Sequence, residues 1–466
     1  MSTLNLFKSS PWAWVPTLYF AEGIPYFIVN NISVLMLAKM GVPNGQMALF
    51  TSLLYLPWTI KPFWSPFVDI IKTKRWWILS MQLLMSAAFI LLTLTIPHPS
   101  VETIAAQQTP ISMFYITLFL FVICAFSSAT HDIAADGFYM LALSQKNQAA
   151  FVGIRSTFYR LSSIFGQGVL VYIAGVIESK SGNVPLSWQL TMLVTAVIFS
   201  AVTLYHTFFI PKPASDKPHL AATSGEQVAQ SATAGDIVKE FGQSFATFFT
   251  KQGLWLAIAF MLLYRLPEAF LLKMCTPFLV DASAHGGLGL STEAVGIVYG
   301  TIGVLSLTIG GILGGIWASR VGLKKSIWLM AACMTLPCLT FVYLSMCLPG
   351  NLVAISVAIA IEQFGYGFGF TAYMLYMIYF SEGEFKTSHY AICTAFMALS
   401  MMIPGMFAGY IQEAIGYVLF FWMVMICCLA TLVVTYFADR KIDPEFGRKG
   451  DSCEEQDPTR LKIKEK

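Results

Sequence analysis

Charged residues are scarce in this chain, where Asp, Glu, Lys and Arg make up 11% of 466 residues. Hydrophobic residues account for 56%, and the polar stretches between them are too short to form a separate folded domain in water. This composition excludes an ordinary soluble protein. The net charge of +3 also offers no basic patch for nucleic acid, so we expect no nucleic-acid partner.

Familiar catalytic and metal-binding motifs are missing as well. The nine cysteines include no CxxC pair and no metal-ligand spacing, and neither HExxH nor GxSxG occurs. We therefore expect no metal, no cofactor and no enzyme activity. A non-transporting membrane receptor or an intramembrane enzyme stays open as an alternative class, because ionisable residues lie inside the apolar segments.

The chain does contain twelve long apolar segments. A helix needs ~20 apolar residues to cross a hydrocarbon core of ~30 Å, and each segment is long enough. We predict an all-α membrane protein with twelve transmembrane helices in two pseudo-symmetric six-helix bundles. The predicted spans are residues 12–38, 46–70, 76–97, 110–144, 149–177, 187–210, 252–281, 292–318, 326–347, 351–380, 388–414 and 416–438.

A polar region rich in Pro, Ser and Thr divides the chain near its middle. We expect an N-terminal bundle at 1–210, a cytoplasmic linker at 211–250, a C-terminal bundle at 251–438 and a charged cytoplasmic tail at 439–466. Between Asp236 and Phe249 the phenylalanines follow one helical face, which predicts an amphipathic helix on the membrane surface. A passive tether is the alternative for this linker.

Lys and Arg are distributed unevenly between the two sides of the predicted spans. If the N-terminus is cytoplasmic, 21 of the 28 lie on that side, and only Lys39 and Lys180 lie outside. Cytoplasmic loops of membrane proteins carry this excess of positive charge, so we predict that both termini are cytoplasmic.

Seven ionisable residues lie deep inside predicted spans, where each charge costs roughly 2.5–3.5 kcal/mol. Six of them fall in spans one, four, seven and ten, which indicates a shared polar cavity and a transport function. The seven residues are Glu22, Asp132, Asp136, Arg160, Arg265, Glu268 and Glu362.

Depth along the spans separates these residues into two groups. Glu22, Arg265, Glu268 and Glu362 should converge near the midplane, where the site of an alternating-access transporter belongs. We expect Glu22 and Glu362, with the two aspartates, to take part in proton coupling, because a carboxyl group in apolar surroundings favours its neutral form. A permanently ionised partner for Arg265 is the alternative role.

Spans four and five form a hairpin that turns near residues 146–147, so residues whose numbers sum to about 292 lie at one level. This predicts two ion pairs, Asp132 with Arg160 and Asp136 with Arg155. The pairs are interpreted as a gate toward the cytoplasm or, alternatively, as a static clamp on the hairpin.

Two connectors repeat across the linker, after spans two and eight. One contains Asp69 and a following Lys/Arg cluster, and the other contains Arg320 in G-I-W-A-S-R-V-G-L-K-K. Both resemble the G-x-x-x-D-R-x-G-R-R loop of the major facilitator superfamily. By that resemblance Asp69 and Arg320 join the gating set, and the first helix of each triplet lines the cavity.

Further motifs resemble the AmpG-like muropeptide permeases and their acetyl-CoA transporter relatives. They are A-T-H-D-I-A-A-D at 129–136, F-Y-R at 158–160 and L-Y-R-L-P-E-A-F at 263–270, together with Glu362 and H-Y-A at 389–391. The family pattern has Gln, Gly and Asp where this chain has His131, Pro267 and Glu268. The resemblance implies proton-driven import of anhydromuropeptides across a bacterial inner membrane by a monomer.

A cargo of this kind has carboxylates and sugar rings. We expect Arg160 and Arg265, with Glu268, to bind its polar groups, and four aromatic residues to stack on its sugars. The aromatic residues are Tyr26, Trp58, Tyr366 and Tyr373. Ordinary packing is the alternative role for each of them. An acyl-CoA or another anionic metabolite is the alternative cargo, for which Lys61 and Lys273 would add positive charge.

Overall fold

The computed structural model describes residues 10–143, 145–213, 216, 234–383, 386–444 and 446. Every regular element in these ranges is helical. Ten helices are long and apolar enough to cross a membrane. The second predicted span is broken into short helices, and the last long helix contains two spans, so the twelve predicted crossings are all present.

The first six spans are built from helices joined by short irregular turns. Their elements are α2 (Val15–Phe27), η2 (Ile28–Ile32), α3 (Ser33–Lys39), α4 (Asn44–Leu53), α5 (Leu56–Ile60), η3 (Lys61–Phe63), α6 (Ser65–Ile70), α7 (Lys74–Thr95), α9 (Tyr115–Ala142), α10 (Gln145–Ser163), η5 (Ile164–Leu170), α11 (Val171–Ser181) and α12 (Val184–Phe209). The short turns η1 (Pro11–Ala13) and η4 (Ile111–Phe114) begin the first and fourth spans, and the short helix α8 (Val101–Ala105) lies between the third and fourth.

The last six spans follow α13 (Ala234–Phe249), a helix in the region where the sequence predicts one. Their elements are α14 (Leu254–Leu263), α15 (Leu266–Val280), α16 (Thr292–Ile297), η8 (Val298–Gly303), α17 (Val304–Val321), α18 (Leu323–Thr335), η9 (Leu336–Cys338), α19 (Leu339–Cys347), α20 (Leu352–Ser381) and α21 (Lys386–Asp439). A short turn, η7 (Ser283–His285), joins α15 to α16.

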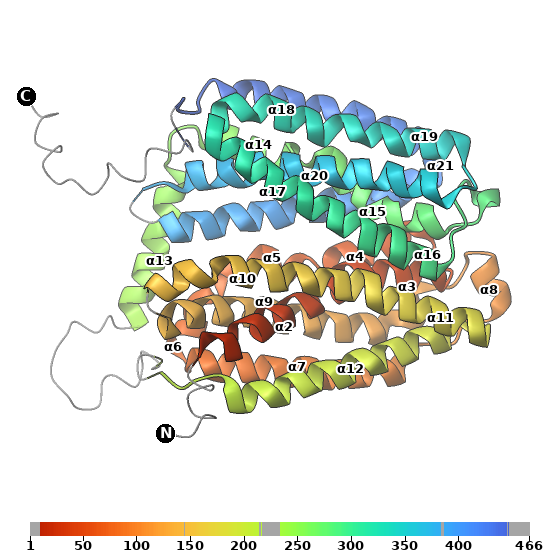
Figure 1. Cartoon of the computed structure of the whole chain (residues 1–466), viewed down its shortest axis with the longest axis horizontal. Helices are drawn as coiled ribbons and strands as arrows, with labels where there is room; N and C mark the ends of the chain where they lie inside the picture. Colours follow the sequence, from red (N-terminus) through yellow and green to blue (C-terminus); the bar gives the residue numbers. More distant parts are fainter. Residues whose placement is uncertain are drawn as a thin grey trace, which may run out of the picture.

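The two sets of helices lie side by side with their axes roughly parallel (Figure 1). The start of α2 and helix α13 lie at one end, here called the linker end, and α8 lies at the opposite end, here called the far end. At the linker end Phe245 of α13 packs against Phe63, with ring centroids 5.4 Å apart. Helix α13 therefore contacts the first half of the molecule as well as the second.

Local breaks in the spans have identifiable causes. Pro57, Pro62 and Pro66 interrupt the second span, because proline lacks the N–H that continues a helix. Gly416 has a φ of 73° and divides α21 into two crossings. Helix α14 ends at Leu263, and Arg265 follows in the break between α14 and α15, two residues before Pro267.

Three spans also contain a π-helical turn, in η2, η5 and η8. A π turn inserts an extra residue into the helix and is frequent at functional sites. The turns η5 and η8 contact each other across the interface between the halves. Glycines permit this contact, since a Cβ on Gly300 would lie 1.9 Å from the carbonyl oxygen of Gln167.

Candidate functional site

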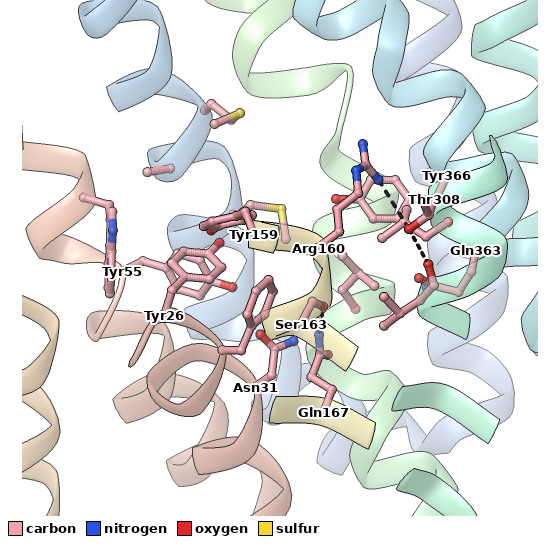
Figure 2. Close-up of a pocket in the computed structure, with 18 of the residues that line it drawn as sticks. Tyr26, Asn31, Tyr55, Tyr159, Arg160, Ser163, Gln167, Thr308, Gln363 and Tyr366 are labelled. Carbon is pink, nitrogen blue, oxygen red and sulfur yellow. Dashed lines mark hydrogen bonds between the residues drawn. The ribbon is translucent and has the colours of Figure 1, made fainter. Parts of the chain in front are cut away.

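A cavity of about 380 Å³ lies between the two halves. Its walls are formed by spans one, two and five of the first half and by spans seven, eight, ten and eleven of the second. Figure 2 shows part of this lining. The polar and aromatic lining residues are Tyr26, Phe27, Asn31, Tyr55, Trp58, Lys61, Ser156, Tyr159, Arg160, Ser163, Gln167, Arg265, Tyr299, Thr308, Gln363, Tyr366 and Thr394.

Span four, predicted to face the cavity, contributes no residue to this lining. Its aspartates instead point toward neighbouring helices of the first half, where they form ion pairs. Spans two, five, eight and eleven take its place, so the rule that the first helix of each triplet lines the cavity is too narrow here.

Arg160 is a cation of the cavity wall whose contacts include no carboxylate among the described residues. It projects from α10, and its Nη1 donates a hydrogen bond of 3.4 Å to Thr308 Oγ1 of the other half (Figure 2). No carboxylate of the described residues lies within ion-pair distance of it. The Arg160 guanidinium is therefore free to bind an anionic group of a cargo.

Arg265 lines the same cavity but is already paired. Its Nε and Nη2 donate to both carboxylate oxygens of Glu268, at 3.0 and 2.7 Å, and Nη2 also donates to the Tyr366 hydroxyl at 3.1 Å. The Arg265 guanidinium lies 4.7 Å from the Phe370 ring centroid. Glu268 is buried behind Arg265 and lines no part of the cavity, so its predicted direct contact with cargo is not supported in this conformation.

The aspartates of span four form one of the two predicted ion pairs. Arg155 lies 2.9 Å from Asp136, which also accepts a hydrogen bond of 3.1 Å from the Tyr19 hydroxyl. The predicted pair between Asp132 and Arg160 is wrong. Asp132 instead pairs with Lys61 of span two at 2.6 Å. Lys61 lines the cavity, so this pair links the cavity wall to the acidic cluster.

Glu22 lies beside this cluster rather than near Arg265. Its charged neighbours include Asp132, Asp136 and Arg155, it is 7% exposed, and its Oε2 has no hydrogen-bond partner. The expectation that Glu22 and Arg265 meet at one midplane site is therefore wrong. Glu22 belongs to the first half's own charge cluster, which consists of Glu22, Asp132, Asp136, Lys61 and Arg155.

Glu362 is buried on α20 and accepts a hydrogen bond of 2.8 Å from Gln363 Nε2. Gln363 lines the cavity, whereas Glu362 does not. Glu362 is thus separated from the cavity by one side chain.

Three of the four predicted aromatic residues line the cavity. Tyr26 and Trp58 pack edge to face with ring centroids 5.1 Å apart, and Tyr366 lies beside Arg265. Tyr373 is fully buried and donates its hydroxyl to the Met261 carbonyl at 2.8 Å. Tyr373 therefore lies outside the cavity lining, because its ring packs within the second half, and its contact with cargo stays a prediction.

The structure does not test whether Asp69 and Arg320, the predicted gate residues of the two connectors, act together. The side chain of Asp69 lies outside the described ones, and Arg320 is exposed in the last turn of α17. His131 does not face the cavity. It is fully buried and contacts Gln82 at 2.9 Å, and Gln82 in turn contacts His206 at 3.0 Å.

Several lining residues carry no sequence signal that would single them out. Asn31, Gln167 and Tyr299 belong to the three π turns, which place them in the cavity wall. Polar residues near the middle of an apolar span give a weak indication of Asn31 and Gln167. The π turns themselves are not readable from the sequence pattern.

At the far end the two halves are closed by a polar contact network, here called the far-end seal. Asn44 Nδ2 lies within 3.0 Å of Asp281, Gln412 and Tyr417, and Tyr417 donates to Asp281 at 2.6 Å. Gln107 Nε2 donates to the other oxygen of Asp281 at 2.8 Å. These contacts separate the cavity from the far end.

Comparison with known proteins gives a consistent result. The Major Facilitator Superfamily model matches residues 17–383. The putative transporter AmpG 4 of Rickettsia conorii is 24% identical over 451 residues, covering 95% of this chain and 100% of that protein. The anhydromuropeptide permease of Escherichia coli K12 is 24% identical over 425 residues, covering 90% of this chain and 77% of the permease.

Solved transporter structures share the fold. A bacterial homologue of the human lysosomal transporter Spinster, inward-facing and unoccupied, aligns with a TM-score of 0.66 at 14% identity, covering 94% of this chain and 98% of that chain. The nucleoside transporter NupG aligns with a TM-score of 0.65 at 15% identity, covering 95% and 100%. At these identities the likeness concerns the fold.

Proposed function

The chain belongs to the major facilitator superfamily as an AmpG-like transporter, and from this premise we propose that it imports anhydromuropeptides by proton-coupled alternating access. The proposed cargo is an amino sugar linked to a peptide, a product of cell-wall recycling. The observation that carries the proposal is Arg160, a cation without a carboxylate partner among the described residues, in a cavity built by both halves.

The cavity has the chemistry that this cargo requires. Arg160 supports binding of a peptide carboxylate, and the faces of Tyr26, Trp58 and Tyr366 support stacking of sugar rings. Amide and hydroxyl groups of Asn31, Gln167 and other lining residues supply hydrogen bonds for acetamido and hydroxyl groups.

Proton coupling is proposed for the first half's charge cluster, with Glu22 as the proton carrier. Three carboxyl groups face two cations in the cluster, and Glu22 has no cation in an ion pair with it among the described contacts. A third negative charge in this setting is costly, which supports proton uptake by Glu22. One proton moving through 100 mV supplies about 2.3 kcal/mol, enough for about 50-fold accumulation of a neutral cargo.

Gating is proposed for the ion pairs at Asp132 and Asp136, which would exchange partners or protons as the halves move. Glu362, one side chain away from the cavity, is proposed as a second protonation site. Asp69 and Arg320 remain proposed members of the gate on the strength of the connector motif alone.

The orientation in the membrane is also a proposal. Among the described residues, most of the Lys and Arg lie at the linker end, which supports its placement in the cytoplasm. We place both termini on the same side from the sequence distribution of Lys and Arg. The proposed units are 1–210, 211–250, 251–438 and 439–466, in a monomer of a bacterial inner membrane. The far-end seal would then close the outer side, and the cavity would open toward the cytoplasm.

The test is uptake by the purified protein in liposomes with an imposed proton gradient. The labelled panel contains an anhydromuropeptide, a free amino sugar and acetyl-CoA. We expect gradient-dependent uptake of the anhydromuropeptide and at least 10-fold less uptake in Arg160→Gln. Uptake of acetyl-CoA alone would favour the alternative cargo, which the cations Lys61, Arg160 and Lys273 also fit.

A further inference from the structure

Five cationic side chains lie in the interior of the described spans, and they fall into two groups. Lys61, Arg155 and Arg265 each form an ion pair with a carboxylate. Arg160 and Lys273 have no carboxylate within ion-pair distance among the described residues. Arg160 belongs to the first half and Lys273 to the second.

Lys273 is more deeply buried than Arg160. Its side chain projects from α15 and is 7% exposed, and its Nζ donates to Thr51 Oγ1 at 3.0 Å. The Tyr55 ring centroid is 5.7 Å from Nζ. An ammonium group carries three N–H donors, and a hydroxyl and a ring face do not neutralise its charge.

A small pocket adjoins this ammonium group. Its volume is about 40 Å³, and its lining includes Lys273, Asn30 and Thr276. It shares Asn31, Tyr55, Leu272 and Met401 with the central cavity, so the two spaces adjoin. The space is large enough for a carboxylate group or a few water molecules, and too small for a sugar ring.

Asn30 provides a second observation at the same place. It is 3% exposed, its Nδ2 donates to the Tyr26 carbonyl at 3.1 Å, and its Oδ1 is buried without a partner. A buried acceptor beside an unpaired ammonium fits a carboxylate with a neighbouring amide N–H, the arrangement found at the end of a peptide.

We propose that Lys273 and Asn30 form a second anion-binding subsite, so that the cargo carries two anionic groups, one held by Arg160 and the other by Lys273. This inference rests on the proposed function only in that the central cavity is the cargo site. A dianionic cargo then contacts a cation of each half at once. Neutral and singly charged sugars bind more weakly, because one cation stays buried without a counter-ion.

The experiment compares two cargos that differ by one charge. The anhydromuramyl disaccharide carrying L-Ala-D-Glu has two free carboxylates, and its L-Ala-D-isoglutamine form has one. Binding of each to the purified full-length protein is measured by titration calorimetry. We expect the wild type to bind the dicarboxylate at least 10-fold more tightly.

Variants assign this preference to one side chain. Lys273→Met should reduce the preference to less than threefold, whereas Lys273→Arg should retain it and so control for loss of folding. Arg160→Gln should weaken binding of both cargos to a similar extent. Equal binding of the two cargos by the wild type, or an unchanged preference in Lys273→Met, would overturn the proposal.

A different result separates this inference from the proposed cargo. If the wild type binds neither glycopeptide, the anhydromuropeptide assignment is wrong. The same variants are then compared with acetyl-CoA and its 3′-dephospho form. If the wild type prefers the 3′-phosphorylated form and Lys273→Met loses this preference, the second subsite is supported. If Lys273→Met weakens binding of both forms equally, the second subsite is rejected.

Discussion

At the scale of single residues, Glu22 is the carboxyl group with the least support from its surroundings. Its Oε2 lacks a hydrogen-bond partner, and its charged neighbours are two further carboxyl groups and Arg155, which pairs with Asp136. Glu22→Gln should therefore lower proton-driven accumulation at least 10-fold while exchange of labelled for unlabelled cargo stays within twofold. Glu362→Gln should act in the same direction.

Uptake with a pH gradient, and exchange without one, measure the two steps separately in liposomes. Glu102→Gln, an exposed change on α8, is the matched control. Normal gradient-driven uptake in both Glu22→Gln and Glu362→Gln would remove these residues from coupling.

The pair between Lys61 and Asp132 allows a charge-reversal test. Lys61→Asp and Asp132→Lys should each reduce uptake at least 10-fold, because each puts two like charges into the partly buried site where Lys61 and Asp132 pair. The double variant should regain at least a third of the wild-type rate. Exchange of Asp132 with Arg160 is the control and should give no rescue. Rescue there would revive the pair expected from the sequence.

Helical geometry explains why only one of the two expected ion pairs forms. The hairpin argument fixes the depth of a residue but not the direction of its side chain. At about 100° per residue, Asp132 and Asp136 lie some 40° apart around their helix, whereas Arg155 and Arg160 lie some 140° apart. Both arginines cannot reach one aspartate face, so Asp136 takes Arg155 and Arg160 faces the cavity.

At the scale of elements, close approach of the two π turns makes Gly300 a test of movement. A Cβ there would lie 1.9 Å from the Gln167 carbonyl oxygen, which belongs to the backbone and cannot rotate away. Gly300→Ala should push η5 and η8 apart, open the far end and reduce uptake at least 10-fold.

Labelling of a single cysteine placed near the far-end seal would report this opening. Gly315→Ala is the control in the same span, because nothing lies within 4 Å of its added Cβ. Equal labelling of the two variants would show that the glycine contact does not hold the far end closed.

The elements differ in how far the sequence predicts them. Long apolar runs give the crossings, since burial of a whole span in lipid leaves little choice of structure. Pro57, Pro62 and Pro66 indicate that the second span is interrupted. The π turns are not readable from the sequence pattern, and η5 and η8 pack against each other across the halves. Tyr299 therefore could not be identified as a lining residue in advance, and Asn31 and Gln167 only weakly.

At the scale of the whole molecule, protonation of Asp281 should make closure of the far end depend on pH. Asp281 lies just beyond the span that ends at Val280, and burial raises the pKa of its carboxyl group, although bonds from Tyr417, Asn44 and Gln107 oppose this. When the halves separate, water should restore the ordinary pKa. Protonation is then easier in the closed state, so acid favours closure, and closure weakens as pH rises through the raised pKa.

Cysteine labelling near the seal between pH 4 and 8 measures this effect, with labelling expected to increase with pH. Asp281→Asn should flatten the profile and keep the far end closed. Glu102→Gln, an exposed change on α8 at the same end, is the control. A profile that Asp281→Asn leaves unchanged would assign the pH response to another group.

In the far-end seal, Asn44 has more oxygen neighbours than hydrogens to donate, and this difference affects how the seal opens. The Asn44 amide nitrogen has two hydrogens and three oxygen neighbours within 3.0 Å. One neighbour therefore always lacks a hydrogen from Asn44, and a single incoming water molecule can donate to that neighbour before any other bond is lost. Rehydration thus has a defined first step, after which the remaining contacts can be replaced one by one rather than all together.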